Sequence, residues 1–330
     1  MAQDIGIDLG TANIVIAVNG KGVVLNEPSV IAVNTNTNKI LAVGKKAYRM
    51  LGKAPDYISV IRPLSNGVIS NDEMTQCLIR EFIHKVSGRQ LLKPRIIICV
   101  PSFITDVESR AVIEAAMTAG GRKVYLIQEP IAAMLGAGVN MSKARGHLVV
   151  DIGGGTTDVA VVSMNGVVTS RSIKVAGNSI DQAIVRYMQK RHKLLIGDKT
   201  AEMLKKELTN LYDPSDDVRM NIGGRNIVKG LPEQMSVSEL EVFDAVEDEV
   251  FEIVDSIRSL LEDTPPELVG DIYENGIILT GGGAMLGGLD KLINRTLNVR
   301  CNIAKDPANC VARGTVQAVS YTHLTLPTIA

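Results

Sequence analysis

The chain has 330 residues, which corresponds to roughly two domains of ordinary size. Hydrophobic residues make up 45% and charged residues 22% of it, a balance typical of globular proteins and not of disordered chains. Its 35 Lys and Arg residues are matched by 36 Asp and Glu residues, and aromatic residues make up only 3%. General nucleic-acid binders carry excess positive charge and stack bases on aromatic rings, so the composition argues against that class.

The first half of the chain predicts strands first and then alternating helices and strands. Apolar runs at 5–10, 14–18, 23–25 and 30–33, with the turn residues Asn19-Gly20 among them, predict a β-meander. Helical periodicity follows at 74–86, a buried strand at 95–100, and a helix that Thr105 and Glu108 begin as a capping box. A strand at 124–127 precedes a further helix, which Pro130 opens.

The second half begins with the same unit, so the chain contains an internal repeat. A strand at 147–151 runs into three glycines, and a strand at 159–164, the turn Asn165-Gly166 and a strand at 167–168 follow. Helices are predicted at 180–193, at 200–208, and from Ser236 or Ser238 to the prolines near 265; a strand at 276–280 and a helix at 285–297 follow. Residues 320–330 carry no charge and no periodicity, which indicates a non-native or disordered tail.

No apolar run is long enough to cross a membrane, and no leader precedes the first strand, so we expect a cytoplasmic protein. The four cysteines form no CxxC pair and are expected to be reduced thiols. The four histidines are scattered, so no zinc site is expected.

Three glycine-rich turns each follow a strand, at 8–13, 151–158 and 280–284. Small residues let backbone N–H groups approach a phosphate closely, although none of these turns is a Walker A loop or a Rossmann fingerprint. Asp8 and Asp151 each end a strand beside such a turn, where carboxylates suit Mg²⁺ that also binds phosphates. The alternative for each Asp is that it only caps its own turn through backbone hydrogen bonds.

With these turns, the sequence resembles the MreB/Mbl family of bacterial actins, within the superfamily of actin, heat-shock chaperones and sugar kinases. The resemblance covers about residues 3–319, and the stretches Asn26-Glu27-Pro28-Ser29 and Thr264-Pro265-Pro266-Glu267-Leu268 favour the narrower family. It implies an α/β, actin-like fold (a duplicated ribonuclease H-like unit) with two lobes and a nucleotide cleft between them. The implied first lobe is 1–33 plus 63–145, with a small insertion at 34–62. The implied second lobe is 146–180 plus 246–319, with an insertion at 181–245.

The resemblance also implies the site residues, with ATP and Mg²⁺ as cofactors. Glu129 and Thr156 match the residues that position the attacking water, and Asp8 and Asp151 would hold Mg²⁺ through water. The alternative for Glu129 is a charge that favours the start of its helix. The residues implied to contact the nucleotide are Thr11, Ala12, Asn13, Gly153, Gly154, Gly155, Lys199, Thr200, Ala201, Glu202, Lys205, Gly281, Gly282, Gly283 and Ala284.

A second feature is the pair Leu91 and Leu92, which stands between Arg89 and Lys93. Apolar residues flanked by cations suit the headgroup boundary of an anionic membrane, and the resemblance implies a membrane-inserted loop there. The alternative is that both leucines pack into their own domain.

The function that the resemblance implies is an ATP-hydrolysing protein that polymerises into membrane-associated filaments. These filaments would organise cell-wall elongation and maintain rod shape, at the inner face of the cell membrane. The implied partners are further copies of the chain, the anionic membrane surface and cell-wall elongation proteins, and no nucleic acid. Two alternatives stay open: a chaperone-type ATPase module, which would need a substrate-binding domain after residue 319, and a metabolite kinase, which would carry Asp where this chain has Glu129.

Overall fold

The computed structural model describes residues 4–65, 68–87, 93–102 and 104–318. The chain divides into two compact units, each of which is described by itself. The first contains the described residues of Met1–Ala144, Val162–Val167 and Ala308–Ala330, and the second contains Arg145–Val161 and Val168–Pro307. The four lobe and insertion boundaries given above stay a prediction.

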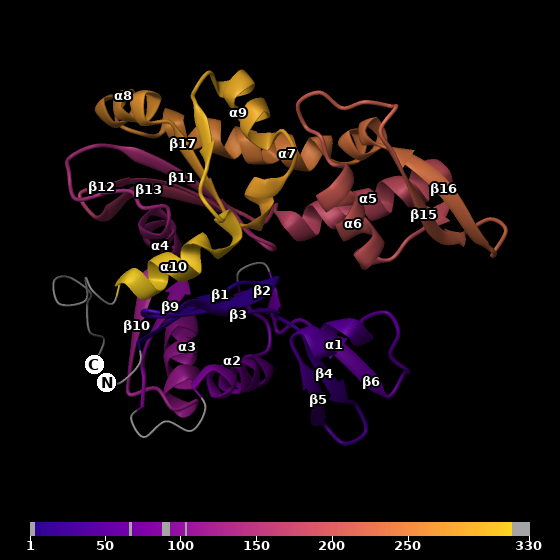
Figure 1. Cartoon of the computed structure of the whole chain (residues 1–330), viewed down its shortest axis with the longest axis horizontal. Coiled ribbons are helices and arrows are strands. Elements are labelled where there is room, and N and C mark those ends of the chain that lie inside the picture. Colours follow the sequence, from indigo (N-terminus) through magenta and orange to yellow (C-terminus); the bar gives the residue numbers. More distant parts are fainter. Residues whose placement is uncertain (1–3, 66–67, 88–92, 103, 319–330) are drawn as a thin grey trace. The chain divides into compact units, whose positions relative to one another are not determined.

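A five-stranded sheet forms the centre of the first unit (Figure 1). Strand β1 pairs antiparallel with β2 and parallel with β9, β2 pairs antiparallel with β3, and β9 pairs parallel with β10. The strands in spatial order are β10 (Lys123–Gln128), β9 (Arg95–Val100), β1 (Asp4–Leu9), β2 (Asn13–Val18) and β3 (Gly22–Pro28).

Helices cover both faces of this sheet because successive strand residues point to opposite sides. Ile5 and Ile7 pack on one face with residues of α2 (Asp72–Ser87) and α3 (Asp106–Thr118). On the other face, Val15 and Ala17 pack with Ala312 of α10 (Cys310–Gln317), and α10 lies against α4 (Glu129–Gly136) (Figure 1). The predicted capping box of Thr105 and Glu108 is confirmed at the start of α3.

The predicted four-stranded meander is correct for three strands and wrong for the fourth. Pro28 ends β3, and the buried Ser29 then bonds back to the loop after β1, so the chain leaves the sheet. The run at 30–33 becomes β4 (Ile31–Asn34) of a separate sheet with β5 (Lys39–Val43) and β6 (Ile58–Ile61). Helix α1 (Lys45–Met50) packs on it through Ala47, and a short hairpin, β7 (Leu64–Ser65) and β8 (Val68–Ile69), follows in the chain.

The second unit repeats the neighbour order of the first sheet, which confirms the internal repeat. The order β3-β2-β1-β9-β10 corresponds to β13-β12-β11-β17-β18. The strands of this second sheet are β11 (His147–Ile152), β12 (Thr157–Ser163), β13 (Gly166–Ile173), β17 (Ile277–Thr280) and β18 (Cys301–Ile303).

The helices of the second unit build one large apolar core with this sheet. Leu148, Val150 and Ile152 of β11 belong to the same buried cluster as Ile180 and Val246. The helices of the unit are α5 (Gly177–His192), α6 (Asp198–Leu208), α7 (Glu239–Glu262), α8 (Pro266–Asn275) and α9 (Leu289–Leu297), with the 3₁₀ turns η1 (Gly282–Met285) and η2 (Pro307–Asn309) near its end or just beyond it.

Two parts of the second unit were not predicted. Pro265 and Pro266 were interpreted only as the end of α7, but Pro266 is also the first residue of α8, a position where its missing N–H costs nothing. The other part is a three-stranded sheet of β14 (Leu194–Leu195), β15 (Arg219–Asn226) and β16 (Pro232–Ser238).

Candidate functional site

The second glycine turn is held against the start of a helix. The N–H of Gly153 donates to the carbonyl of Thr156 at 2.9 Å, which closes the turn between β11 and β12. From the first turn of α5, the N–H of Gly177 donates to Gly153 at 3.1 Å and that of Asn178 donates to Gly154 at 2.8 Å. The predicted phosphate loop therefore has a fixed backbone shape and lies beside the positive end of a helix dipole.

The third glycine turn lies at the same edge of the sheet. Strands β11 and β17 run parallel and pair Asp151 with Thr280, so the turns that follow them are neighbours. Gly281 has a φ of 81°, and a Cβ there would lie 2.3 Å from the carbonyl oxygen of Ile152. A Cβ on Gly283 would lie 2.2 Å from the Ile152 side chain, whereas one on Gly282 would meet nothing within 4 Å. Gly281 and Gly283 therefore serve close packing of the two turns, and Gly282 is the glycine with open space beside it.

Two buried carboxylates lie beside these turns. The hydroxyl of Thr280 donates to Oδ1 of Asp151 at 2.6 Å, and only 4% of Asp151 is exposed. Asp158 on β12 is also buried, and burial raises its pKa to about 6; the charge of Asp151 adds to this effect, while the hydroxyls of Ser172 and Thr156 oppose it. Neither hydroxyl makes a well-aligned hydrogen bond with the Asp158 carboxylate. Asp158 was not predicted as a site residue from the sequence, although it ends the same Gly-rich motif.

Lys205 connects α6 to the start of α5. Its ammonium group lies 2.8 Å from Oδ1 of Asp181 and donates to the carbonyl of Gly177 at 2.8 Å. Burial raises the pKa of Asp181, and the charge of Lys205 opposes that rise. Because Gly177 also bonds to Gly153, Lys205 and the second glycine turn belong to one connected group. Asp181 was not identified from the sequence, since its role depends on a partner 24 residues away.

The remaining residues implied for the nucleotide in this unit lie in the first two turns of α6. Ala201 is fully buried, so it packs in the core. Glu202 makes an ion pair with Lys206 at 2.5 Å along the same helix. Thr200 donates its backbone N–H to Gly197 at 2.9 Å, and Lys199 stands beside it. Outside α6, Ala284 of the third glycine turn (280–284) is also fully buried.

In the first unit, the buried Ser29 fixes the turn after β1. Its hydroxyl donates to the carbonyl of Gly10 at 2.6 Å, and its N–H donates to Ala12 at 2.9 Å. A Cβ on Gly10 would lie 2.6 Å from the carbonyl oxygen of Asn13, so this tight turn requires glycine. Thr11 is buried within the turn, and Asp8 is the last residue but one of β1, the strand that leads into the turn. The Asn-Glu-Pro-Ser stretch is thus part of the support of this turn.

Glu129 projects from the same sheet edge as the turn after β1. Asp8 pairs with Cys99 of β9, and the neighbouring Val100 pairs with Gln128 at the end of the parallel strand β10. Two strand spacings separate β1 from β10, which is about 10 Å. Glu129 begins α4 and is half-buried.

The residues present fit a magnesium ion that is bound mainly through water and phosphate. In the part of the chain that the structure describes, no three His, Cys, Asp or Glu side chains cluster closely enough to hold a metal ion by themselves. Mg²⁺ commonly keeps several waters and takes one or two carboxylates together with substrate phosphates. The Asp151 carboxylate, which Thr280 orients beside the two glycine turns, is of that kind.

The predicted membrane residues Leu91 and Leu92, and the tail at 320–330, lie outside the described residues. None of the described helices combines the length and the apolar character that crossing a membrane requires.

Comparisons with known proteins find the same relatives over almost the whole chain. A sequence model described as MreB/Mbl protein matches residues 2–326. The cell shape-determining protein Mbl of Bacillus subtilis is 49% identical over 315 residues, which are 95% of each chain. The cell shape-determining protein MreB of Escherichia coli is 44% identical over 320 residues, which are 95% of this chain and 92% of that protein.

Solved structures of an MreB protein are similar to this chain in both sequence and fold. MreB 5 of Spiroplasma citri bound to AMPPNP is 39% identical, with a TM-score of 0.92 over 98% of this chain and 97% of that one. The same protein bound to ADP gives a TM-score of 0.93. The actin-like α/β fold expected from the sequence is therefore confirmed.

Proposed function

The chain belongs to the MreB/Mbl family, and from that premise we propose that it is a cytoskeletal protein that binds and hydrolyses ATP. The main support is the connected group in the second unit, in which two glycine turns, the start of α5 and Lys205 meet at one sheet edge. A relative of the same fold that is 39% identical binds AMPPNP and ADP.

We assign the binding of the phosphates to backbone N–H groups of the turns at 10–13 and 153–156. The hydrogen bonds from Ser29 and from the first turn of α5 hold both turns in shape before the ligand arrives. Lys199, Thr200, Ala201, Glu202 and Lys205 are proposed to flank the adenosine from α6, and 281–284 from the third turn. Since Ala201, Gly281, Gly283 and Ala284 pack in the protein interior, their part would be to shape the surface.

The hydrolytic step is proposed to use Glu129 and Thr156. A carboxylate within hydrogen-bond reach of water orients it and accepts its proton, and the Thr156 hydroxyl would help to fix that water. Asp8 and Asp151 would hold Mg²⁺ through water, and Mg²⁺ supplies positive charge to the phosphates. The Thr280 hydroxyl keeps Asp151 in place for this role.

We further propose that the protein assembles with copies of itself into filaments at the inner face of the cell membrane. Leu91 and Leu92 would attach the filament, and many weak contacts along a polymer would add up to firm binding. The named relatives are cell shape-determining proteins, which supports a role in cell-wall elongation and rod shape.

The test uses the full chain with ATP, Mg²⁺ and vesicles that contain anionic phospholipid. Phosphate release and sedimentation are measured for the wild type, Asp151→Asn, Glu129→Gln and the exposed control Asp217→Asn. We expect Asp151→Asn to lose ATP-dependent sedimentation, while Glu129→Gln keeps ATP binding and hydrolyses about 10²- to 10⁴-fold more slowly. Asp217→Asn should match the wild type.

Membrane attachment has its own variant. Leu91→Ser combined with Leu92→Ser should reduce sedimentation with vesicles and leave ATP binding intact.

Retained assembly and hydrolysis in Asp151→Asn would remove that residue from the site. A chain that stays monomeric at every concentration and phosphorylates a sugar would instead be a metabolite kinase.

A further inference from the structure

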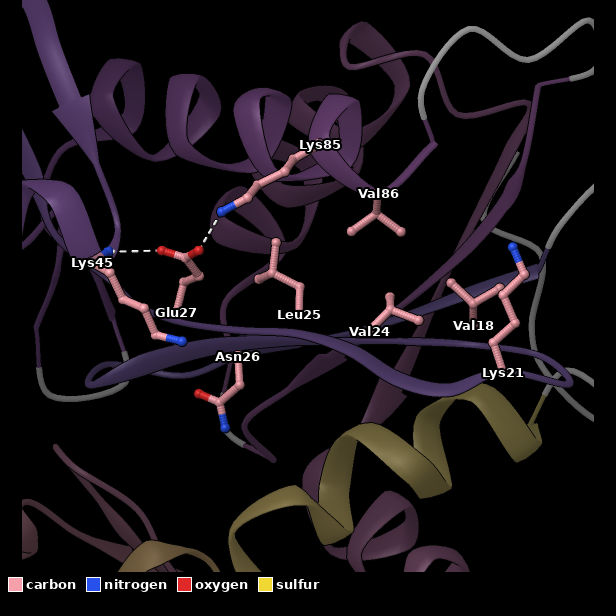
Figure 2. Close-up of a pocket in the computed structure, with 9 residues that line it drawn as sticks. All are labelled: Val18, Lys21, Val24, Leu25, Asn26, Glu27, Lys45, Lys85 and Val86. Carbon is pink, nitrogen blue, oxygen red and sulfur yellow. Dashed lines mark hydrogen bonds and ion pairs between the residues drawn. The ribbon is translucent and has the colours of Figure 1, made fainter.

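A cavity lies in the first unit, between β3, the C-terminal half of α2 and the start of α1 (Figure 2). Its volume is about 330 Å³, which is at the lower end of the range for small-molecule sites. The residues that line it are Val18, Lys21, Val24, Leu25, Asn26, Glu27, Lys45, Lys85 and Val86.

A β-bulge makes the floor of this cavity apolar. Ile16 pairs with Leu25 but the next residue, Ala17, pairs with Val23, so Val24 is an extra residue in β3. Val23 packs toward α10 on the opposite face of the sheet. Val24 and Leu25 therefore both point into the cavity, where a regular strand would turn one of them away (Figure 2). Val24 is 42% exposed, so its side chain is accessible to a ligand in the cavity.

The rim of the cavity carries more positive than negative charge. Lys21, Lys45 and Lys85 contribute three ammonium groups against the one carboxylate of Glu27. Glu27 is already engaged, because it makes an ion pair with Lys85 and accepts the backbone N–H of Lys45 at 2.7 Å. Among the residues that the structure describes, no carboxylate pairs with Lys21.

Glycine allows this arrangement at Glu27. Gly44 has a φ of 62°, and a Cβ there would lie 2.2 Å from Oε2 of Glu27. The backbone before α1 can thus approach the carboxylate and donate to it. Burial alone would raise the pKa of Glu27, but the hydrogen bonds and charges of Lys85 and Lys45 bring it below its usual value. The acid stays ionised and neutralised, which leaves a surplus of positive charge for a ligand.

We propose that this cavity binds a small organic anion with a short apolar chain. The chain would lie over Val24, Leu25 and Val86. Because Lys21 and Lys45 lie at opposite ends of the cavity, the anionic group would face one of these two lysines (Figure 2). This site involves none of the residues assigned to ATP. Its test can therefore fail or succeed whether or not the proposed function is correct.

The test is a saturation-transfer NMR titration of the nucleotide-free full chain with sodium octanoate below its micellar concentration. Octylammonium and 1-octanol, which have the same chain, serve as the cationic and neutral controls. We expect saturable binding of octanoate with a Kd of about 1 mM or tighter. Octanol should bind more weakly, and octylammonium most weakly.

Variants place the binding in this cavity. Lys21→Met combined with Lys45→Met removes the ion pair at whichever end the carboxylate binds, and should weaken octanoate binding about fivefold, as for the loss of one partly exposed ion pair. Glu27→Gln keeps an acceptor for the Lys45 N–H and releases Lys85, so it should strengthen binding. Lys53→Met, an exposed lysine of the same unit, is the matched control and should change nothing. A thermal melt of each variant checks that it is folded.

Three results would overturn the proposal. One is octanol binding as tightly as octanoate, since the lysines would then contribute nothing. Another is octylammonium binding best, which would make Glu27 the dominant group. The third is a Kd for octanoate that is the same in the double variant (Lys21→Met with Lys45→Met), in Lys53→Met and in the wild type.

Discussion

The crossing of α4 and α10 gives a sharp prediction about Gly314. A Cβ on Gly314 would lie 1.7 Å from the carbonyl oxygen of Ala132, and one on Gly136 would lie 1.9 Å from that of Cys310. Since ordinary contact begins near 3.4 Å, Gly314→Ala requires the two helices to separate by about 1.7 Å. The helices meet backbone to backbone, so no flexible side chain can move aside.

The magnitude follows from two opposing effects. Overpacking of this kind costs about 1–3 kcal/mol, and sometimes more where backbone is displaced. Alanine in place of glycine inside a helix returns up to about 1 kcal/mol. We expect Gly314→Ala to lower the free energy of unfolding of the first unit by about 2 kcal/mol, which corresponds to a fall in Tm of roughly 5 °C.

The matched control is Gly270→Ala in α8, where a Cβ would meet nothing within 4 Å. That substitution should stabilise the second unit by about 0.5–1 kcal/mol. Scanning calorimetry of the wild type and both variants, without nucleotide, separates the two effects. If Gly314→Ala melts at or above the wild-type temperature, the close approach of α4 and α10 described above is incorrect.

Three further predictions concern single side chains. Because burial raises the pKa of Asp158 from 3.8, its ordinary value in an unfolded chain, to about 6, wild-type stability should fall as pH rises between these values, by up to about 3 kcal/mol. In denaturant titrations at a series of pH values, with EDTA to remove metal ions, the free energy of unfolding of Asp158→Asn should not show this fall. If the free energy of unfolding of the variant and of the wild type depends on pH in the same way, the prediction is wrong. The pKa of Glu27 is lowered from 4.5, so its contribution is present above 4.5 and is lost as the pH drops below that value. The stability difference between wild type and Glu27→Gln should shrink in acid, and a constant difference would contradict this reasoning. Ser238 caps α7 by accepting the N–H of Glu241, so Ser238→Ala should cost about 1 kcal/mol, whereas Ser259→Ala inside the same helix should not.

The sequence predicted the repeated unit well because its signals are local. A strand, a glycine turn and a second strand leave a short pattern that does not depend on distant residues, and both copies fold as expected. The fourth strand was placed wrongly because the hydrogen bonds from Ser29 to Gly10 and to Ala12 redirect the chain, and the first of these joins residues 19 positions apart. Pro266 shows another limit, since the same residue ends one helix pattern and begins the next.

The candidate site was only partly predictable for a similar reason. The Gly-rich motif identifies Asp151, but only the sheet register places Thr280 beside it. Asp158 had a possible signal, since it follows Asp151 by seven residues and lies on the adjacent strand. The close packing of Gly281 and Gly283 against Ile152 could not be predicted. A run of glycines in the sequence does not indicate whether it contacts a ligand or a neighbouring strand.

Helix α10, which packs on the sheet of the first unit, comes from the C-terminal part of the chain. A Cβ on Gly6 of β1 would lie 2.6 Å from the backbone of Val316, so α10 closes directly onto the first strand. During synthesis the ribosome must therefore deliver the whole of 145–307 before the earlier sheet receives its cover. The second unit can become compact while the first still exposes the apolar side of β1 and β2, and a nascent chain that stalls before Ala308 would present that side to proteases and chaperones.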